Sequence, residues 1–202
     1  MIAVLDYGLG NVGSIVRMFN RIGKSVKIIK SKHEFNSEFH LVIPGVGSFD
    51  TAIKKLKDLD LVDVIIRHAE NGNPLLGICL GMQLLCNGSE EGSLEGFGLI
   101  DGFVRKLQFI KNEYTVPNMG WRNVQVRDNS SFFNIAELSR FYFVHSYYVD
   151  LKDHCICTAY CQHSIKFCAA FQKNNIFGVQ FHPEKSHKYG MKILEAFSQT
   201  QK

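Results

Sequence analysis

The segment Pro74-Leu75-Leu76-Gly77-Ile78-Cys79-Leu80-Gly81-Met82-Gln83-Leu84-Leu85 joins an apolar run of strand length to a helix-like run through one cysteine. Gly-x-nucleophile-x-Gly is the pattern of a nucleophile elbow, in which a strand turns sharply into a helix and exposes the side chain at the apex. The two glycines are expected because a Cβ at either position would collide with the neighbouring strand and helix. The unpaired N–H groups at a helix start favour a thiolate, so Cys79 is the candidate nucleophile. A buried, inert thiol is the alternative that this segment alone leaves open.

The overall composition is that of an ordinary globular protein. The chain has 202 residues, of which 46% are hydrophobic and 21% charged, and this length is enough for one domain with a sizeable core. The net charge is +4 without a dense block of Lys and Arg, so charge gives no argument for nucleic acid or a membrane as a partner. We therefore expect a single domain over residues 1–202.

The cysteines and the N-terminus indicate a cytoplasmic protein. The six cysteines are too sparse for a disulfide scaffold. The start, Met1-Ile2-Ala3-Val4-Leu5-Asp6, has no basic region and reaches an acid within six residues, so we interpret it as a first strand and not as a signal peptide. The longest apolar runs are far shorter than a bilayer span. Free thiols in a reducing compartment follow from these features.

The N-terminal region predicts a parallel α/β sheet. Residues 2–5 form an apolar run of buried-strand length, 12–22 show helical spacing with Asn11 as the candidate N-cap, and 25–29 form the next strand. Strand, glycine-rich turn, helix and strand, in this order, are typical of a parallel α/β unit.

The glycines of the first turn match a dinucleotide-binding fingerprint only formally. Gly8, Gly10 and Gly13 have its spacing, but the second strand ends in Lys30, where such a site needs an acid. We interpret the glycines as a tight turn with close helix packing, and we expect no bound cofactor.

The rest of the chain changes from helical to strand-rich patterns. Residues 41–43 read as a third strand, and helical spacing predicts helices at 50–56 and 61–70. After residue 93, short strand-like pieces follow at 102–107, 124–126, 141–144, 156–160, 166–171 and 176–180, and 187–197 read as a closing helix. The expected fold class is α/β, with a mostly parallel central sheet flanked by helices and an antiparallel strand addition in the C-terminal half.

The segment Val179-Gln180-Phe181-His182-Pro183-Glu184 offers a base for the thiol. If this segment is extended, His182 and Glu184 point to the same side, because strand side chains alternate. A carboxylate beside an imidazole selects its tautomer and raises its basicity. A surface histidine with a nearby acid is the alternative for this segment alone, but the upstream cysteine favours a catalytic pair.

Metal binding is the competing use of cysteine and histidine. The candidate ligands cluster late in the chain, at Cys155, Cys157, Cys161, His163 and Cys168. Their spacing does not match the paired ligands of structural zinc sites, so we expect buried thiols and no metal site.

Three segments together, in this order, resemble the class I (triad) glutamine amidotransferases: Pro44-Gly45-Val46-Gly47, Gly77-Ile78-Cys79-Leu80-Gly81-Met82-Gln83 and His182-Pro183-Glu184. Within that class the chain is similar to the glutaminase subunits of imidazole glycerol phosphate synthases. The narrower resemblance lies at 6–11, 117–121, 143–148 and 181–186. It covers essentially the whole chain.

This resemblance implies a reaction and the residues that perform it. Cys79 would attack the side-chain amide of glutamine to form a γ-glutamyl thioester, His182 would carry the proton to the leaving ammonia, and Glu184 would orient His182. Backbone N–H groups in the oxyanion hole would come from Val46, Gly47 and Leu80. The α-amino and α-carboxylate groups of glutamine would be held by Gly47, Gln83, Ser146 and Tyr147.

The resemblance also implies a partner. Such subunits form a heterodimer with a (βα)₈-barrel cyclase, which receives the ammonia through an internal channel for histidine biosynthesis and whose ligand switches the glutaminase on. A peptide flip within 44–47 is the expected switch, because glycine permits it. Asn11, Trp121 and Lys185 resemble positions that face this partner, and Trp121 is the only tryptophan of the chain.

Two departures from the family pattern leave the acceptor of the ammonia open. Members in histidine biosynthesis usually carry His where this chain has Asn118, and His187-Lys188-Tyr189 is an unusual continuation of the last motif. One alternative is a paralogous subunit that supplies ammonia for a nucleotide-linked sugar of surface polysaccharide or flagellin glycans. A second alternative is a stand-alone cysteine hydrolase on the same fold.

Overall fold

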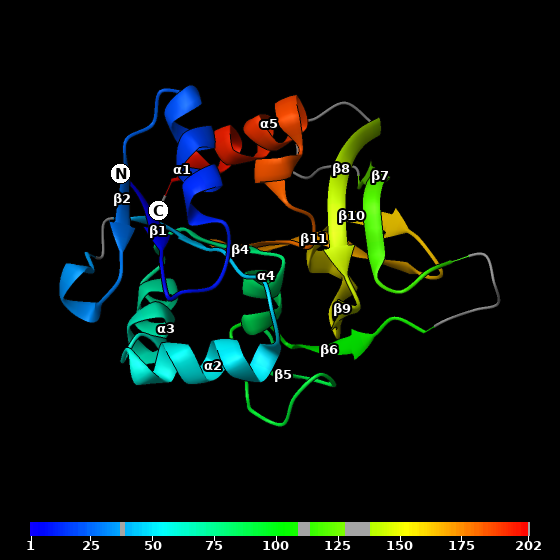
Figure 1. Ribbon diagram of the computed structural model, residues 1–202, viewed down its shortest axis with the longest axis horizontal. Coiled ribbons are helices and arrows are strands. Elements are labelled where there is room, and N and C mark those ends of the chain that lie inside the picture. The colour runs from blue at the N-terminus through cyan, green and yellow to red at the C-terminus, as the bar shows by residue number, and fades with distance from the viewer. Residues whose placement is uncertain (37–38, 109–113, 128–137, 202) are drawn as a thin grey trace.

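A nine-stranded sheet forms the centre of the residues that the computed structural model describes, which are 1–36, 39–108, 114–127 and 138–201 (Figure 1). The strand order is β2 (Val26–Ile29), β1 (Ile2–Leu5), β3 (His40–Ile43), β4 (Leu75–Ile78), β12 (Ile176–Val179), β11 (Lys166–Lys173), β10 (Cys157–Gln162), β7 (Asn118–Val126) and β8 (Leu138–His145). From β2 to β12 all neighbours run parallel, and from β12 to β8 all neighbours run antiparallel. The predicted fold class is confirmed.

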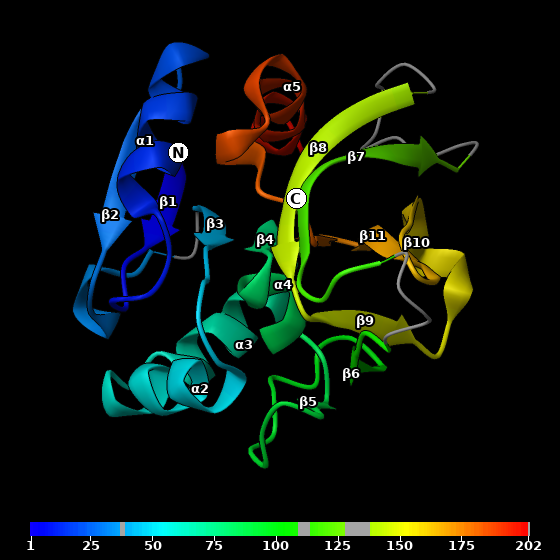
Figure 2. The ribbon, with the colours of Figure 1, turned by 45° about the vertical axis from the view of Figure 1, so that its right-hand side comes forward.

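A smaller sheet joins the end of β8. It consists of β5 (Gly88–Ser89), β6 (Gly102–Lys106) and β9 (Tyr147–Leu151), with β5 parallel and β9 antiparallel to β6 (Figure 2). The sequence pattern does not predict β5 or β9. The first is only two residues long, and the second follows β8 after the single residue Ser146, without a glycine or proline to mark a turn.

Helices cover both faces of the large sheet (Figure 1). One face carries α1 (Val12–Arg21) and α5 (His187–Ser198), and the other carries α2 (Phe49–Asp58), α3 (Val62–Glu70) and α4 (Leu80–Leu84). Short 3₁₀ turns lie at η1 (Lys32–Glu34), η2 (His154–Ile156) and η3 (Pro183–Lys185). The predicted helices are confirmed to within two residues at each end. In the part of the chain that is described, none of the helices combines the length and the apolar character that crossing a bilayer requires.

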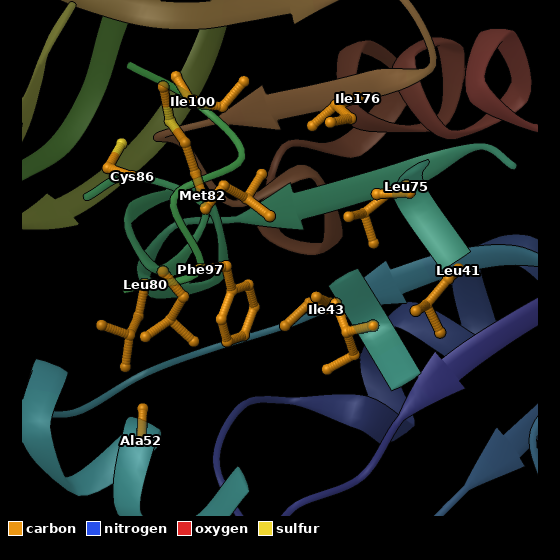
Figure 3. Close-up of a cluster of buried hydrophobic side chains, with 14 of the residues drawn as sticks. Leu41, Ile43, Ala52, Leu75, Leu80, Met82, Cys86, Phe97, Ile100 and Ile176 are labelled. Atoms are coloured by element: carbon orange, nitrogen blue, oxygen red, sulfur yellow. The ribbon is translucent and has the colours of Figure 1, made fainter. Parts of the chain in front are cut away.

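The strands of the parallel half are buried on both faces. In β1, Ala3 and Leu5 pack into the core under α2, α3 and α4, whereas Ile2 and Val4 pack into the core under α1 and α5. Figure 3 shows part of the first core, where the strand residue Ile43 lies in the same cluster as α4 side chains. Because both faces are covered, a ligand can reach this half of the sheet only at the ends of its strands.

The turn from β4 into α4 leaves no room for side chains at its two glycines. A Cβ on Gly77 would lie 2.6 Å from the backbone oxygen of Gly81, and a Cβ on Gly81 would overlap the backbone carbonyl of Ile43 in β3. The expected steric requirement for glycine is therefore confirmed. Between the two glycines, Cys79 adopts a φ of 54° and a ψ of −109°, a strained conformation for a residue with a Cβ.

Gly81→Ala should lower the free energy of unfolding by about 1–3 kcal/mol, because β3 or α4 must move to admit the methyl group. Urea unfolding followed by circular dichroism measures this change. Gly13→Ala is the matched control: an added Cβ there makes only an ordinary 3.5 Å contact with Arg17, and alanine favours a helix by about 0.5–1 kcal/mol. Equal stability of Gly81→Ala and the wild type would contradict the steric requirement.

Candidate active site

Cys79 directly follows the buried strand β4, at the start of α4, and lines a pocket of about 410 Å³. Its backbone N–H donates to the carbonyl of Val179 (2.8 Å), which ties the turn to the neighbouring strand β12. The residue is only 6% exposed. The strained turn therefore presents the sulfur to the pocket while the rest of the residue stays in the core.

The imidazole and carboxylate expected beside the thiol lie just beyond β12. His182 Nδ1 and Glu184 Oε1 are 2.8 Å apart, and both side chains are 2% exposed. His182 itself is extended, but Pro183–Lys185 forms the 3₁₀ turn η3, so the pair meets across a turn and not through strand alternation. Ser186 holds this turn in place, since its Oγ donates to the His182 carbonyl (2.7 Å).

His182 interacts with Cys79 as well as with Glu184. Burial disfavours the charged imidazole, but the charge and hydrogen bonding of Cys79, followed by those of Glu184, outweigh it and raise the pKa of His182 to about 10. Within the described residues, His182 Nε2 is buried and has no hydrogen-bond partner of good geometry. A thiol, an imidazole and a carboxylate are thus the ionisable groups that interact here, and the imidazole–carboxylate contact fixes the orientation of the His182 ring.

Two buried glutamines connect the sulfur to the pocket wall. Gln180 Nε2 donates to Cys79 Sγ (3.7 Å), and Gln83 Nε2 donates to Gln180 Oε1 (3.2 Å) and to the backbone oxygen of Tyr147 (3.1 Å). Sequence reasoning selected Gln83 but missed Gln180. The available signal is its position two residues before His182, which places both on one side of an extended segment.

The structure brings every expected substrate residue to the pocket. Gly47, Gln83, Ser146 and Tyr147 line it together with the expected oxyanion-hole residues Val46 and Leu80; its other residues are Glu91, Pro117, Val144 and His145. Sequence reasoning missed Glu91, whose Oε2 accepts the backbone N–H of Phe49 (2.9 Å). No motif marks it, because it enters the pocket from the loop after β5.

The segment 44–47 is anchored at its first half and open at its second. The Tyr7 hydroxyl donates to the Pro44 carbonyl (2.7 Å), and Gly10 packs so closely that a Cβ there would lie 2.9 Å from Pro44 Cβ. Gly8 and Gly10 have φ values of 82° and 105°, which agrees with the expected tight turn, but the close contact of Gly10 is with the segment 44–47 and not with a helix. Val46 is 42% exposed, and Gly47 has a φ of 113°, so this half of the segment faces solvent in a conformation that only glycine adopts easily.

The expected partner-facing residues do not line the Cys79 pocket. Asn11 caps α1 by accepting the backbone N–H of Ser14 (3.2 Å), as the sequence predicts. The Trp121 ring stacks on His187 with centroids 5.5 Å apart, and Lys185 Nζ lies 5.3 Å from the centroid of the Tyr142 ring. Tyr142 also contacts Trp121 edge-to-face at 6.3 Å, so Trp121 and Lys185 belong to one surface cluster.

The late cysteines lie in the antiparallel half of the sheet. Cys157 and Cys168 are buried, and their sulfurs contact backbone oxygens of Ala159 (3.3 Å) and Ala170 (3.2 Å) in their own strands. Within the described ranges, no group of three or more His, Cys, Asp and Glu residues is arranged to hold a metal ion.

Known proteins are similar to this chain in sequence or in fold. The model of the family described as glutamine amidotransferase class-I matches residues 3–199. The chain is 46% identical over 199 residues to imidazole glycerol phosphate synthase subunit HisH 2 of Methanococcus maripaludis, and 41% identical over 200 residues to subunit HisH 2 of Pseudomonas aeruginosa, covering 98% of both chains in each case. A chain in the structure of PurLQS from Thermotoga maritima has the same fold, with a TM-score of 0.74 and 17% identity over 98% of this chain and 96% of that one. This protein therefore belongs to the class-I glutamine amidotransferase family.

Proposed function

We propose that this chain, as one domain spanning residues 1–202, is the glutaminase subunit of an imidazole glycerol phosphate synthase and works in histidine biosynthesis in the cytoplasm. The observation that carries the proposal is the His182–Glu184 pair, 2.8 Å apart, just beyond the strand β12 that pairs with the strand leading to Cys79. A relative named as a subunit of that synthase is 46% identical over 98% of both chains, which supports the choice of synthase.

Glutamine cleavage would proceed in two stages. The Cys79 sulfur adds to Cδ of the glutamine side chain, and the C–N bond breaks as His182 passes its proton to the leaving nitrogen, which departs as ammonia. Water then adds to the thioester as His182 accepts its proton, and the C–S bond breaks to release glutamate and the free thiol. Glu184 keeps the imidazole oriented throughout, through the bond to Nδ1.

Each stage places negative charge on the carbonyl oxygen, and backbone N–H groups would stabilise it. Leu80 is the first residue of α4, so its N–H has no acceptor inside the helix. Val46 and Gly47 lie in the same pocket and would supply the second donor once the peptide turns. Losing one such donor typically costs about 2.7–4 kcal/mol of barrier.

The remaining pocket residues would select glutamine. Gln83, Ser146 and Tyr147 would hold the α-amino and α-carboxylate groups, with Gly47 beside them. This places the side-chain amide of glutamine at the sulfur, and the pocket of about 410 Å³ lies within the usual range for small-ligand sites.

A (βα)₈-barrel cyclase would take up the ammonia in a heterodimer. Ammonia released into water becomes ammonium and is lost to the acceptor, so a buried path into the partner serves the reaction. The surface cluster of Trp121 and Lys185, with Asn11, would face that partner. A large aromatic side chain beside a cation is a common anchor in interfaces.

Cys79→Ala should reduce glutamine hydrolysis by at least about 1,000-fold, since loss of the nucleophile removes the covalent route. Glutamate release is measured with the cognate barrel subunit and its ligand; the chain alone should show little activity. Added ammonium salts should restore cyclase product in the Cys79→Ala complex. Cys155→Ala, which removes an exposed thiol, is the control and should behave as wild type. Failure of the ammonium rescue in an intact complex would contradict ammonia transfer.

Glu184→Gln should lower the free energy of unfolding most at or below neutral pH. Burial lowers the pKa of His182, but Cys79 and then Glu184 raise it to about 10, above its ordinary value of 6.5, so the stabilisation of the charged imidazole, to which Glu184 contributes, is complete below pH 6.5 and is lost as the pH rises through about 10. The difference from wild type should be about 1.5–3 kcal/mol at pH 6 and should shrink by pH 10. Urea unfolding at both pH values measures it, with the exposed Glu195→Gln as control. If the difference in unfolding free energy between the variant and the wild type grew with pH, the assignment of a charged His182 beside Glu184 would be refuted.

Asn118 favours a second candidate acceptor, a nucleotide-linked sugar, because histidine-pathway members usually carry His there. The two candidates differ in the product of the reconstituted complex. Imidazole glycerol phosphate formed from glutamine supports the histidine pathway. Ammonia release with no imidazole product would favour the sugar pathway.

A further inference from the structure

A continuous chain of hydrogen bonds runs from Arg122 in β7 to the sulfur of Cys79. Its successive members are Arg122, Asn118, His145, the carbonyl of Tyr147, Gln83, Gln180 and Cys79, and the contacts measure 2.8–3.7 Å. The side chains between the two ends are at most 6% exposed. Buried polar groups that satisfy one another in this way hold a single arrangement, because any rotation leaves a donor or acceptor unpaired.

Counting donors and acceptors fixes the direction of the first bonds. A guanidinium can only donate, so the Asn118 atom that faces Arg122 Nε at 3.1 Å is the oxygen. The Asn118 NH₂ group then donates to His145 Nε2 at 3.0 Å, which must accept and carries no proton. The proton of His145 is therefore on Nδ1, which donates to the Tyr147 carbonyl at 2.8 Å.

The surroundings of His145 keep it neutral. Burial lowers its pKa to about 4, the bond to the Tyr147 carbonyl opposes this change, and the charges of His163, His182 and Arg122 add to it. The Phe167 ring packs edge-on against the imidazole at 5.0 Å. The ring is thus held in one orientation and one tautomer.

The Tyr147 carbonyl connects this arrangement to the pocket. It accepts from His145 Nδ1 and also from Gln83 Nε2 at 3.1 Å. Tyr147 and Ser146 line the pocket beside Gln83, at the corner where β8 ends and β9 begins. A different tautomer of His145 would place a lone pair against the carbonyl and push this corner away from Gln83.

Arg122 is itself held by the backbone of β7. Its guanidinium folds back over the preceding residues of the strand, among which Gly120 has a φ of 113°. It donates to the carbonyls of Trp121 (3.1 Å) and Met119 (3.2 Å) as well as to Asn118. The Asn118 amide cannot flip without leaving this guanidinium facing an NH₂ group.

We propose that Asn118 and Arg122 are positioning residues of the glutamine pocket. Together they hold His145 in its Nδ1–H tautomer, and His145 in turn holds the Tyr147 carbonyl and the Gln83 carboxamide beside Cys79. Neither residue touches the reacting atoms. The inference rests on the proposed function for the substrate, but the tautomer of His145 is independent of it.

The first test is nitrogen-15 NMR of the histidine side chains in the whole chain. In the wild type, His145 should carry its proton on Nδ1 at pH 7 and keep Nε2 unprotonated down to about pH 4. In Asn118→Asp, the new carboxylate faces Nε2, so Nε2 should be protonated at pH 7. The proposal would be overturned if the wild type carried the His145 proton on Nε2. It would also be overturned if a folded Asn118→Asp variant left Nε2 unprotonated at pH 7, as in the wild type.

The second test compares two electrophiles at Cys79, a glutamine-like diazo-ketone that needs the pocket and iodoacetamide that needs only the thiol. In Asn118→Leu and in Arg122→Met, the rate constant for labelling by the diazo-ketone should fall about tenfold, which is the effect expected from the loss of one buried hydrogen bond. The rate constant for labelling by iodoacetamide should stay within about twofold of the wild-type value. Arg140→Met, in the neighbouring strand β8 and outside the chain of bonds, should change neither.

The outcomes separate a positioning role from a structural one. Positioning would be refuted if the variants lowered the rate constants with both electrophiles by the same factor, or if they lowered neither rate constant. If wild-type Cys79 shows no preference for the diazo-ketone over iodoacetamide, the proposed glutaminase function fails. The NMR measurement of the His145 tautomer then still tests the positioning role of Asn118 and Arg122.

Discussion

The close approach of α4 to β3 and β4 is the constraint on which the rest of the site depends. It is possible only because Gly77 and Gly81 have no Cβ, and between these two glycines Cys79 has a φ of 54°. A relaxed turn would widen the gap between strand and helix and move the sulfur relative to the groups around it. The strain at one residue is held by packing of buried strands on both sides, which is how proteins generally maintain such conformations.

The strand β12 brings the base to this turn. It pairs parallel with β4 and antiparallel with β11, so it is the point at which the two halves of the sheet meet. His182 lies three residues after β12, and Cys79 lies one residue after the parallel strand β4, so both residues lie at the carboxyl ends of neighbouring strands. Burying an imidazole and a carboxylate is costly unless they pair, and the 2.8 Å contact supplies that compensation.

The antiparallel half contributes the wall of the pocket. Ser146 separates β8 from β9 and lets the chain pass from the large sheet to the small one. His145 lies immediately before this corner, bonded to Asn118 in β7 and to the carbonyl beyond the corner. The polar network thus joins three strands around a pocket that apolar packing alone would leave less defined.

Local patterns in the sequence were sufficient for the parallel half of the fold and for the elbow at Cys79, because each depends on spacing within a few residues. They also indicated the pair of His182 and Glu184, but the turn η3 and not strand alternation brings these two side chains together. A family resemblance pointed to Gln83 and Ser146, and both residues line the pocket. Gln180, Glu91, the strand β9 and the bonds that join Arg122, Asn118 and His145 emerged only from the folded chain. Their partners lie up to about a hundred residues away in the sequence (Gln180 and Cys79 are 101 apart), and only the register of paired strands brings such residues within hydrogen-bonding distance.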